Sequence, residues 1–364
     1  GAASVSNQVR AVQRQRFRRF RQSALQVKAP RAQLRLWAQV ALLVGIATLQ
    51  VRFQYLLNAW NREFFDSLER HEVRELWHHT ADFVPLAAGS VVLAVLAMGV
   101  RMRAQRRWRA HLTENILGRW LADDHFRKLD AREHDYANPE YRIGEDVRVA
   151  TEAPVELGVA LFTSVLTAGT FFSVLWQIGG ALELELGGWF VRIPGYLVLG
   201  VMSYAALFTF GMVMMGERLT GVIEDKNQAE AEFRAGMTLL RECGEAKAPA
   251  ELAPVARERI AVTQPQVFRA WREVAREVMR TTWVSHANFL LTPVVGWFLC
   301  APKYLKGAMT LGELTQTAAA FVTVLGAFNW LVDNFQRFAD WRSSVDRVAA
   351  LLLALDQLDR TDET

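Results

Sequence analysis

Apolar side chains in this chain gather into long uncharged runs, and charged side chains gather into blocks between them. A helix needs about 20 mostly apolar residues to cross the hydrocarbon of a membrane. A weaker run with two Gln covers 36–51. Five stronger runs of at least 18 residues contain no Asp, Glu, Lys or Arg: 83–100, 157–182, 193–216, 281–302 and 314–332. The pattern therefore predicts six membrane-spanning helices.

The charged blocks after the second and fourth spans extend the helical pattern. In 106–129 the apolar residues Trp108, Leu112, Ile116 and Trp120 recur at helical spacing, and 217–241 behaves similarly. A helix of about 40 residues is about 60 Å long, which exceeds the thickness of a bilayer. We therefore expect an all-α membrane protein whose helices continue well beyond the membrane.

These observations divide the chain into three parts. A basic segment covers 1–33, a six-helix transmembrane domain covers 34–350, and a polar linker covers 351–364. The expected helices have the approximate bounds 34–66, 82–121, 147–182, 193–241, 265–302 and 308–350.

Lys and Arg are concentrated in alternate connecting segments, which predicts the orientation of the spans. Of the 42 basic residues, 35 lie in one set of segments and 6 in the other. The basic set consists of 1–35, 101–148, 217–280 and 337–364. Both termini are therefore expected to be cytoplasmic. The net charge of +4 reflects this topology and anionic lipid headgroups, and we expect no nucleic-acid partner.

The sequence contains no pattern of residues typical of catalysis or metal binding. Cys243 and Cys300 are too few for a disulfide framework, and the seven His have no metal-ligand spacing. A P-loop needs Lys directly after Gly so that the Lys reaches the phosphates, and none of the six Lys follows a Gly. We expect no catalytic site, metal or cofactor in this chain.

Several motifs in order carry a resemblance to a known family. They are WNREFFDSLERHE (60–72), NPEYRIGEDV (138–147), IEDKNQAEAEFR (223–234), MTLGELTQ (309–316) and WLVDNFQRFADWRSSVDRV (330–348). With them the chain resembles the transmembrane domain of ABC transporters of the SbmA/BacA-like peptide-uptake family and their ATPase-fused relatives. It is also similar to the peroxisomal subfamily D transporters.

The resemblance implies an exporter-type, homodimeric subunit in a bacterial inner membrane, in contact with membrane lipid. It would move peptides, including antimicrobial peptides, or other bulky hydrophilic solutes by alternating access. ATP and Mg²⁺ would bind to an ATPase domain, fused after residue 364 or separate, and the polar end of the chain favours this energy source. Only with such a domain would the protein be an ATPase.

Three alternatives stay open. A proton-driven importer of the SbmA/BacA type would have no ATPase. An acyl-CoA or lipid transporter, or an exporter, could use the same fold. A membrane scaffold or sensor would not transport at all.

Acidic residues near the third span and on the extension of the fourth are candidates for the substrate cavity or for proton coupling. They are Glu145, Asp146, Glu152, Glu156, Glu224 and Glu230. In the resembled family, acids before the third span line the central cavity. The structural alternative for Glu145 and Asp146 is an ion pair with Arg142 or Arg148. The alternative for Glu152 and Glu156 is snorkelling to the membrane interface.

The segment 57–77 is unusually charged for the end of a span. It contains five acids and three Arg, on the side from which an imported cationic substrate would arrive. We therefore predict an outer gate, with the candidates Trp60, Glu63, Phe64, Phe65, Asp66 and Glu69. The alternative is a structural cap in which the aromatic residues form an interfacial belt.

Overall fold

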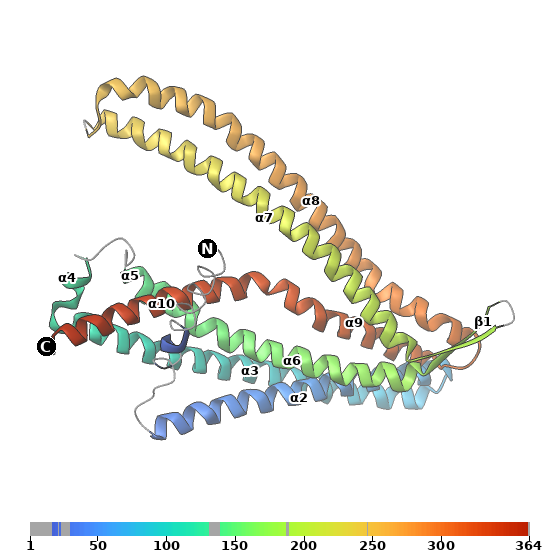
Figure 1. The fold of residues 1–364 in the computed structure, drawn as a ribbon. Coiled ribbons are helices and arrows are strands. Elements are labelled where there is room, and N and C mark those ends of the chain that lie inside the picture. Colours follow the sequence, from blue (N-terminus) through green and yellow to red (C-terminus); the bar gives the residue numbers. More distant parts are fainter. Residues whose placement is uncertain are drawn as a thin grey trace. The chain divides into compact units, whose positions relative to one another are not determined.

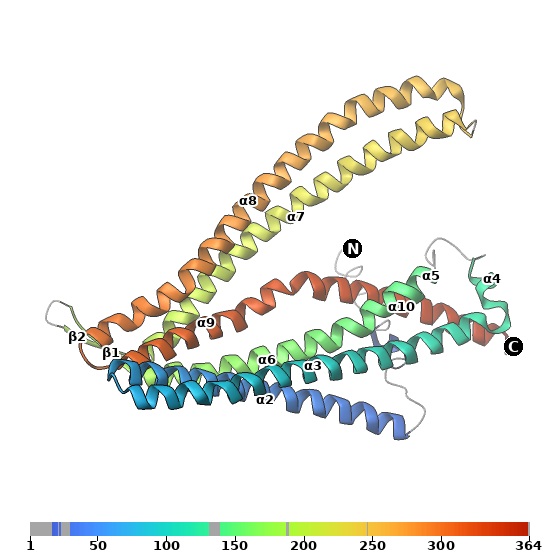
Figure 2. The ribbon, with the colours of Figure 1, turned by 180° about the vertical axis from the view of Figure 1, so that it is seen from behind.

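A computed structural model describes residues 17–20, 22, 30–130, 139–186, 189–245 and 247–362. These residues form long helices and one two-stranded hairpin (Figures 1 and 2). The chain divides into two compact units. Unit 1 comprises residues 1–178 and 306–364, and unit 2 comprises residues 179–305.

Unit 1 is a helical bundle to which both halves of the chain contribute. Helix α2 packs against α3 and α9, and α10 contacts α3. The long helices are α2 (Pro30–Glu69), α3 (Val73–Leu121), α6 (Val147–Gly179), α9 (Leu311–Asp333) and α10 (Phe335–Asp362). Short segments between α3 and α6 are η1 (Ala122–Asp124), α4 (His125–Asp130), α5 (Pro139–Tyr141) and the π-helical η3 (Arg142–Asp146).

A cluster of buried apolar side chains joins α3, the start of α6 and α10. Leu112 and Ile116 of α3 are fully buried in it. Four leucines of α10 recur at helical spacing and form a single buried stripe: Leu351, Leu352, Leu355 and Leu358. Arg19 extends this contact, because its guanidinium forms an ion pair with Asp356, and the hydrogen bond to that carboxylate raises the pKa of Arg19.

A short turn joins α2 to α3. Its backbone closes the end of α2 through hydrogen bonds from Arg70 N to Asp66 O at 3.0 Å and from Glu72 N to Ser67 O at 3.1 Å. His71 has φ of 58°, a left-handed conformation that is uncommon outside glycine. The charged segment 57–77 therefore comprises the end of one helix, a tight turn and the start of the next.

Unit 2 is a long antiparallel helical hairpin with a small β-hairpin at its base. The strands are β1 (Ala181–Leu186) and β2 (Trp189–Pro194), and the helices are α7 (Tyr196–Gly244) and α8 (Ala253–Leu305), with η4 (Ala250–Leu252) before α8. Helix α8 has 53 residues, which corresponds to a length of about 80 Å. The two helices pack along one another (Figure 1).

Polar side chains also join the two helices of unit 2. Tyr204 donates from its hydroxyl to Asn288 Oδ1 at 2.9 Å. Glu277 of α8 is buried and lies 3.1 Å from Arg218 of α7 and 2.9 Å from Arg280. The hairpin is thus fastened by specific contacts as well as by apolar packing.

The six expected spans are confirmed by helix length and composition. Within the described part of the chain, six helical stretches are long and apolar enough to cross a membrane. Several are longer than expected: the second begins at Val73 and the fifth reaches back to Ala250. The additional helical turns contain charged residues, so the uncharged runs of the sequence underestimate the lengths of these helices.

The structure differs from the expected segment bounds in three places. The β-hairpin was not predicted; it arises where Gly180 and Gly195, with φ of 58° and 62°, interrupt the helical path. The expected sixth helix, 308–350, is divided between α9 and α10. Residues 351–362 were expected to be a linker, yet they continue α10 and contribute buried leucines. The basic segment 1–33 lies largely outside the described residues.

Candidate functional site

Carboxylates at the end of α2 cap the start of α9. The backbone N–H of Gly312 donates to Asp66 Oδ1 at 2.8 Å, and the N–H of Leu311 donates to Glu69 Oε2 at 2.9 Å. The first N–H groups of a helix have no acceptor within the helix, and its N-terminus favours negative charge. Asp66 and Glu69 therefore stabilise α9 from a neighbouring helix. We call this contact the α2–α9 junction.

The α2–α9 junction leaves little free space. Arg62 Nη2 donates to Glu313 Oε1 at 2.9 Å. Thr310 and Glu313 form a capping box, in which each side chain accepts from the backbone N–H of the other at 3.1 Å. A Cβ atom on Gly312 would collide with the carbonyl oxygen of Arg62 and with the carboxylate of Asp66. Only glycine fits at this position.

The aromatic gate candidates fasten α2 to α3 next to the junction. Trp60 Nε1 donates to the carbonyl oxygen of His79 at 2.6 Å. The Trp60 ring lies 5.2 Å from that of Phe64 and 4.8 Å from that of Phe83, between ring centroids. Phe64 meets Phe65 edge to face at 5.6 Å. The contacts of Trp60 with His79 and Phe83 join α2 to α3, whereas those of Phe64 with Trp60 and Phe65 lie within α2.

A polar cavity of about 410 Å³ opens beside the junction, lined by residues of α2, α3, α6 and α9. We call it the junction cavity. Glu63, Arg70 and Glu75 line it and are exposed, so it is reached from the surface. Gln316 of α9 lines it too and is only 4% exposed. Among the gate candidates, Glu63 and Asp66 line this cavity.

Two of the cavity candidates at the start of α6 share one arginine. Arg148 donates from Nε to Glu145 Oε2 and from Nη1 to Glu152 Oε2, both at 3.0 Å. Arg109 of α3 lies 3.5 Å from Glu152. These side chains are between 33% and 42% exposed, so solvent screens each pair and its contribution to stability is small. Glu145 and Glu152 thus lie together, as the ion-pair alternative for Glu145 expects.

Asp146 is held separately by α10. Arg347 donates from Nε to Asp146 Oδ2 at 2.8 Å, and Ser344 donates from its hydroxyl to Oδ1 at 3.1 Å. The Asp146 side chain is 1% exposed. It is the last residue of the π-helical segment η3, a type of irregularity that occurs frequently at functional sites. Neither Arg142 nor Arg148 is the partner in this pair.

Glu156 forms a second link between α6 and α10. Its Oε2 lies 2.7 Å from Arg337 Nη2. Their side chains are 33% and 47% exposed, so the pair is accessible to water. Together with the pair of Asp146 in η3 and Arg347, this contact joins η3 and α6 to α10 through two ion pairs.

The two candidates on α7 belong to unit 2 and differ from each other. Glu230 accepts from Trp271 Nε1 at 3.0 Å and lies 3.8 Å from Lys226 Nζ. The Lys226 ammonium also lies over the Trp271 ring, 4.8 Å from its centroid. Glu224 is exposed. Glu230 therefore helps to fasten α7 to α8, whereas Glu224 presents its carboxylate at the surface.

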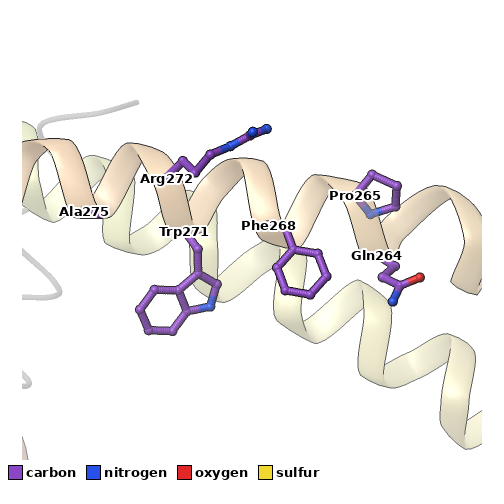
Figure 3. Close-up of a pocket in the computed structure, with 6 residues that line it drawn as sticks. All are labelled: Gln264, Pro265, Phe268, Trp271, Arg272 and Ala275. Carbon is purple, nitrogen blue, oxygen red and sulfur yellow. The ribbon is translucent and has the colours of Figure 1, made fainter.

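Trp271 also borders a surface hollow of about 730 Å³ on α8. Figure 3 shows Gln264, Phe268 and Trp271 projecting from one side of the helix and Arg272 from the opposite side. Phe268 and Trp271 are 60% and 49% exposed. Unit 2 thus exposes aromatic side chains within the basic segment 217–280.

Sequence reasoning missed several residues that the structure places at these sites. Arg347 lies in the motif at 330–348, but nothing in its spacing names Asp146 as its partner. Gln316 stands within the apolar run 314–332, and a polar residue there was a usable signal, because buried polar groups in membrane spans usually have a function. Glu277 lies in the basic segment 217–280, where nothing in the sequence indicates that it is buried.

The six long apolar helices in the described part of the chain define a multi-pass membrane protein. The chain belongs to the family of the ABC transporter transmembrane region 2, whose model matches residues 25–305. The predicted resemblance to ABC transporter membrane domains is thereby confirmed.

Curated relatives support the same assignment. The chain is 26% identical over 314 residues to the inner membrane ABC transporter ATP-binding protein YddA of Escherichia coli, covering 85% of this chain and 55% of the relative. It is 23% identical over 317 residues to the chloroplastic ABC transporter D family member 2 of Arabidopsis thaliana, covering 87% and 42%. An uncharacterized ABC transporter ATP-binding protein of Haemophilus influenzae is 23% identical over 283 residues, covering 76% and 46%. The chain spans about half the length of these relatives.

Proposed function

We propose that this chain is one subunit of a homodimeric transporter that moves peptides, including cationic antimicrobial peptides, or other bulky hydrophilic solutes. Membership of the ABC transporter family supports the transport role. The observation that carries the substrate class is the surplus of exposed acids beside the α2–α9 junction. Asp66 and Glu69 cap α9, but Glu63, Glu72 and Glu75 are exposed and available to a cationic solute.

Transport is by alternating access and is driven by ATP. The relatives are named as ATP-binding proteins and are about twice as long as the matched region, which supports an ATPase partner domain that binds ATP and Mg²⁺. The paired acids favour this energy source over a proton gradient. A proton relay needs carboxyl groups free to take up and release protons, whereas Glu145, Asp146, Glu152 and Glu156 each contact an arginine.

The protein lies in the bacterial inner membrane with both termini in the cytoplasm. The distribution of Lys and Arg supports this orientation. It places the α2–α9 junction and the junction cavity on the outer side, where an imported solute arrives first. The ion pairs that α6 forms with α10 then lie nearer to the cytoplasmic side, close to the expected ATPase.

A second candidate is an acyl-CoA or lipid transporter, and a specific cavity favours it. Helices α2, α3 and α6 line an open pocket of about 340 Å³, formed almost entirely by apolar side chains such as Leu43, Trp108 and Phe162. An acyl chain fits this chemistry, because burial of apolar surface stabilises the bound state. The Arabidopsis relative belongs to the D family, to which the sequence is also similar.

Proteoliposomes that contain the full-length protein with its ATPase domain test these alternatives. They are loaded with a fluorescent Arg-rich peptide or with a fluorescent acyl-CoA, and ATP is added outside to the molecules whose ATPase faces outward. The proposal predicts ATP-dependent loss of peptide from the lumen, unaffected by a protonophore. Movement of acyl-CoA without movement of peptide would overturn it in favour of the second candidate. Peptide movement driven by an imposed proton gradient without ATP would overturn the energy source.

A further inference from the structure

A residue that lines the junction cavity, Gln316, and its neighbour Asn58 carry buried side-chain oxygen atoms that lack hydrogen-bond donors in the described part of the chain. Gln316 lines the cavity and is only 4% exposed. Its Oε1 accepts no hydrogen bond in the described part of the chain. Asn58, 7% exposed, donates from Nδ2 to the backbone carbonyl of Gln316 at 3.1 Å, which leaves Asn58 Oδ1 likewise without a donor. Buried polar groups are nearly always hydrogen-bonded. Gln316 Oε1 and Asn58 Oδ1 therefore each lack a hydrogen-bond donor among the described residues.

The charges around the opening favour a cation as that donor. Arg62 and Asp66 already contact α9 across the junction. The exposed charged side chains that remain at the opening are the carboxylates Glu63 and Glu75 and the guanidinium of Arg70, so the acids exceed the bases by one. His79 adds a buried Nδ1 without a hydrogen bond, 3.8 Å from Glu63 Oε2. An opening with an excess of acids beside the unpaired acceptor of Gln316 suits a positively charged donor.

We propose that the junction cavity binds the guanidinium or ammonium group of one cationic side chain, and that Gln316 Oε1 accepts a hydrogen bond from it. Hydrogen bonds from a charged donor are roughly twice as strong as neutral ones. The volume of about 410 Å³ is near the lower limit of small-molecule sites, which suits one side chain rather than a folded peptide. The inference rests on the proposed function, because the side chain belongs to the transported peptide.

A matched pair of ligands tests the inference without transport. A fluorescent tetrapeptide with one Arg is compared with the same peptide carrying citrulline, the neutral analogue of Arg. Binding to the full-length protein in nanodiscs is followed by fluorescence anisotropy without nucleotide. The cavity predicts that the Arg peptide binds about tenfold more tightly, the effect of one additional charge-assisted hydrogen bond.

Variants assign this preference to the cavity. Gln316→Leu removes the acceptor and should abolish the preference for Arg, whereas Gln316→Glu restores an acceptor and should retain it. Gln228→Leu is the control, because Gln228 is exposed on α7 and donates only to Glu232, at 2.8 Å. Glu75→Gln changes an exposed residue at the opening and should reduce the preference severalfold even if the Gln316 variants do not fold.

The ratio of the two affinities is measured within each variant, so it does not depend on how much protein is folded. Equal binding of the two peptides to the unmodified protein would overturn the inference, as would an unchanged ratio in Gln316→Leu and Glu75→Gln. If peptide transport persists in that case, only the cavity assignment fails. If the ratio behaves as expected but the peptide is not transported, only the proposed function fails.

Discussion

The acids at the start of α6 and Glu224 on α7 look alike in the sequence but differ in their contacts. In unit 1, Glu145 and Glu152 share Arg148, and Asp146 is buried against Arg347. In unit 2, Glu224 is exposed on the surface of α7. The first group links helices, whereas Glu224 makes no such link among the residues described. A charged position near a span therefore indicates a function only after its partner is known.

The same contrast separates the gate candidates. Asp66 and Glu69 are bound to backbone N–H groups of α9, whereas Glu63 is exposed beside the junction cavity. We expect substitutions of the bound acids to act mainly on stability. Substitutions of the exposed acids should act mainly on the capture of a cationic solute.

The largest expected effect on the free energy of unfolding is at the ion pair of Asp146 and Arg347. Asp146→Ala leaves Arg347 and Ser344 without their acceptor, and removal of one partner of a buried pair costs about 3–5 kcal/mol. Because Arg347 is 42% exposed, we expect the lower end of this range. The free energy of unfolding in detergent, from denaturant titration, measures it.

A double variant controls for the loss of charge itself. Replacing both partners by apolar residues, Asp146→Leu with Arg347→Met, should recover part of the stability, since no charge is then left unpaired. If Asp146→Ala were as stable as the unmodified protein, Asp146 would behave like the exposed Glu224. The contrast between the paired acids of unit 1 and Glu224 would then fail.

The next effect is expected at the α2–α9 junction. Gly312→Ala places a methyl group against the Arg62 carbonyl and the Asp66 carboxylate, and overpacking of this kind costs about 1–3 kcal/mol. Gly326→Ala is the matched control in the same helix, because a Cβ there meets nothing within 4 Å. It should be neutral or stabilising by up to about 1 kcal/mol. Equal melting temperatures for the two variants would contradict the close contact.

A smaller effect separates the two kinds of gate acid. Asp66→Ala removes a cap from α9 and should lower the free energy of unfolding by about 1 kcal/mol. Glu63→Ala alters an exposed residue and should change it by less than about 0.5 kcal/mol. Peptide uptake at low peptide concentration should fall in Glu63→Ala, because this variant loses an exposed acid that captures the cationic peptide. Unchanged uptake would reduce the segment to a structural cap.

The smallest effect on stability is expected on α7. Glu224→Gln should leave the free energy of unfolding within about 0.5 kcal/mol, because the carboxylate is exposed. Glu230→Gln weakens the contact with Trp271 and should cost about 1 kcal/mol. Thermal melting of the two variants side by side checks the difference. Greater destabilisation by Glu224→Gln would reverse the assignment.

The sequence predicted the helices better than the contacts between them. Long apolar runs locate spans because the hydrocarbon of the membrane requires them, and six were found. The hydrogen-bond partners of the polar residues could not be predicted from the sequence. Arg347 is 201 residues from Asp146, and Gln316 is 258 residues from Asn58. Local spacing holds no information on such pairs. The β-hairpin was also missed, because most of its residues lie between the expected helices 147–182 and 193–241, in a stretch interpreted only as a connecting loop.

ATP hydrolysis by the full-length protein in nanodiscs tests the central claim, that this is the membrane region of an ATP-driven peptide transporter. The rate is measured against increasing concentrations of an Arg-rich peptide, its citrulline analogue and palmitoyl-CoA. The account predicts that the Arg-rich peptide stimulates hydrolysis at lower concentration than the citrulline analogue. Stimulation by palmitoyl-CoA alone, with no response to either peptide, would contradict it.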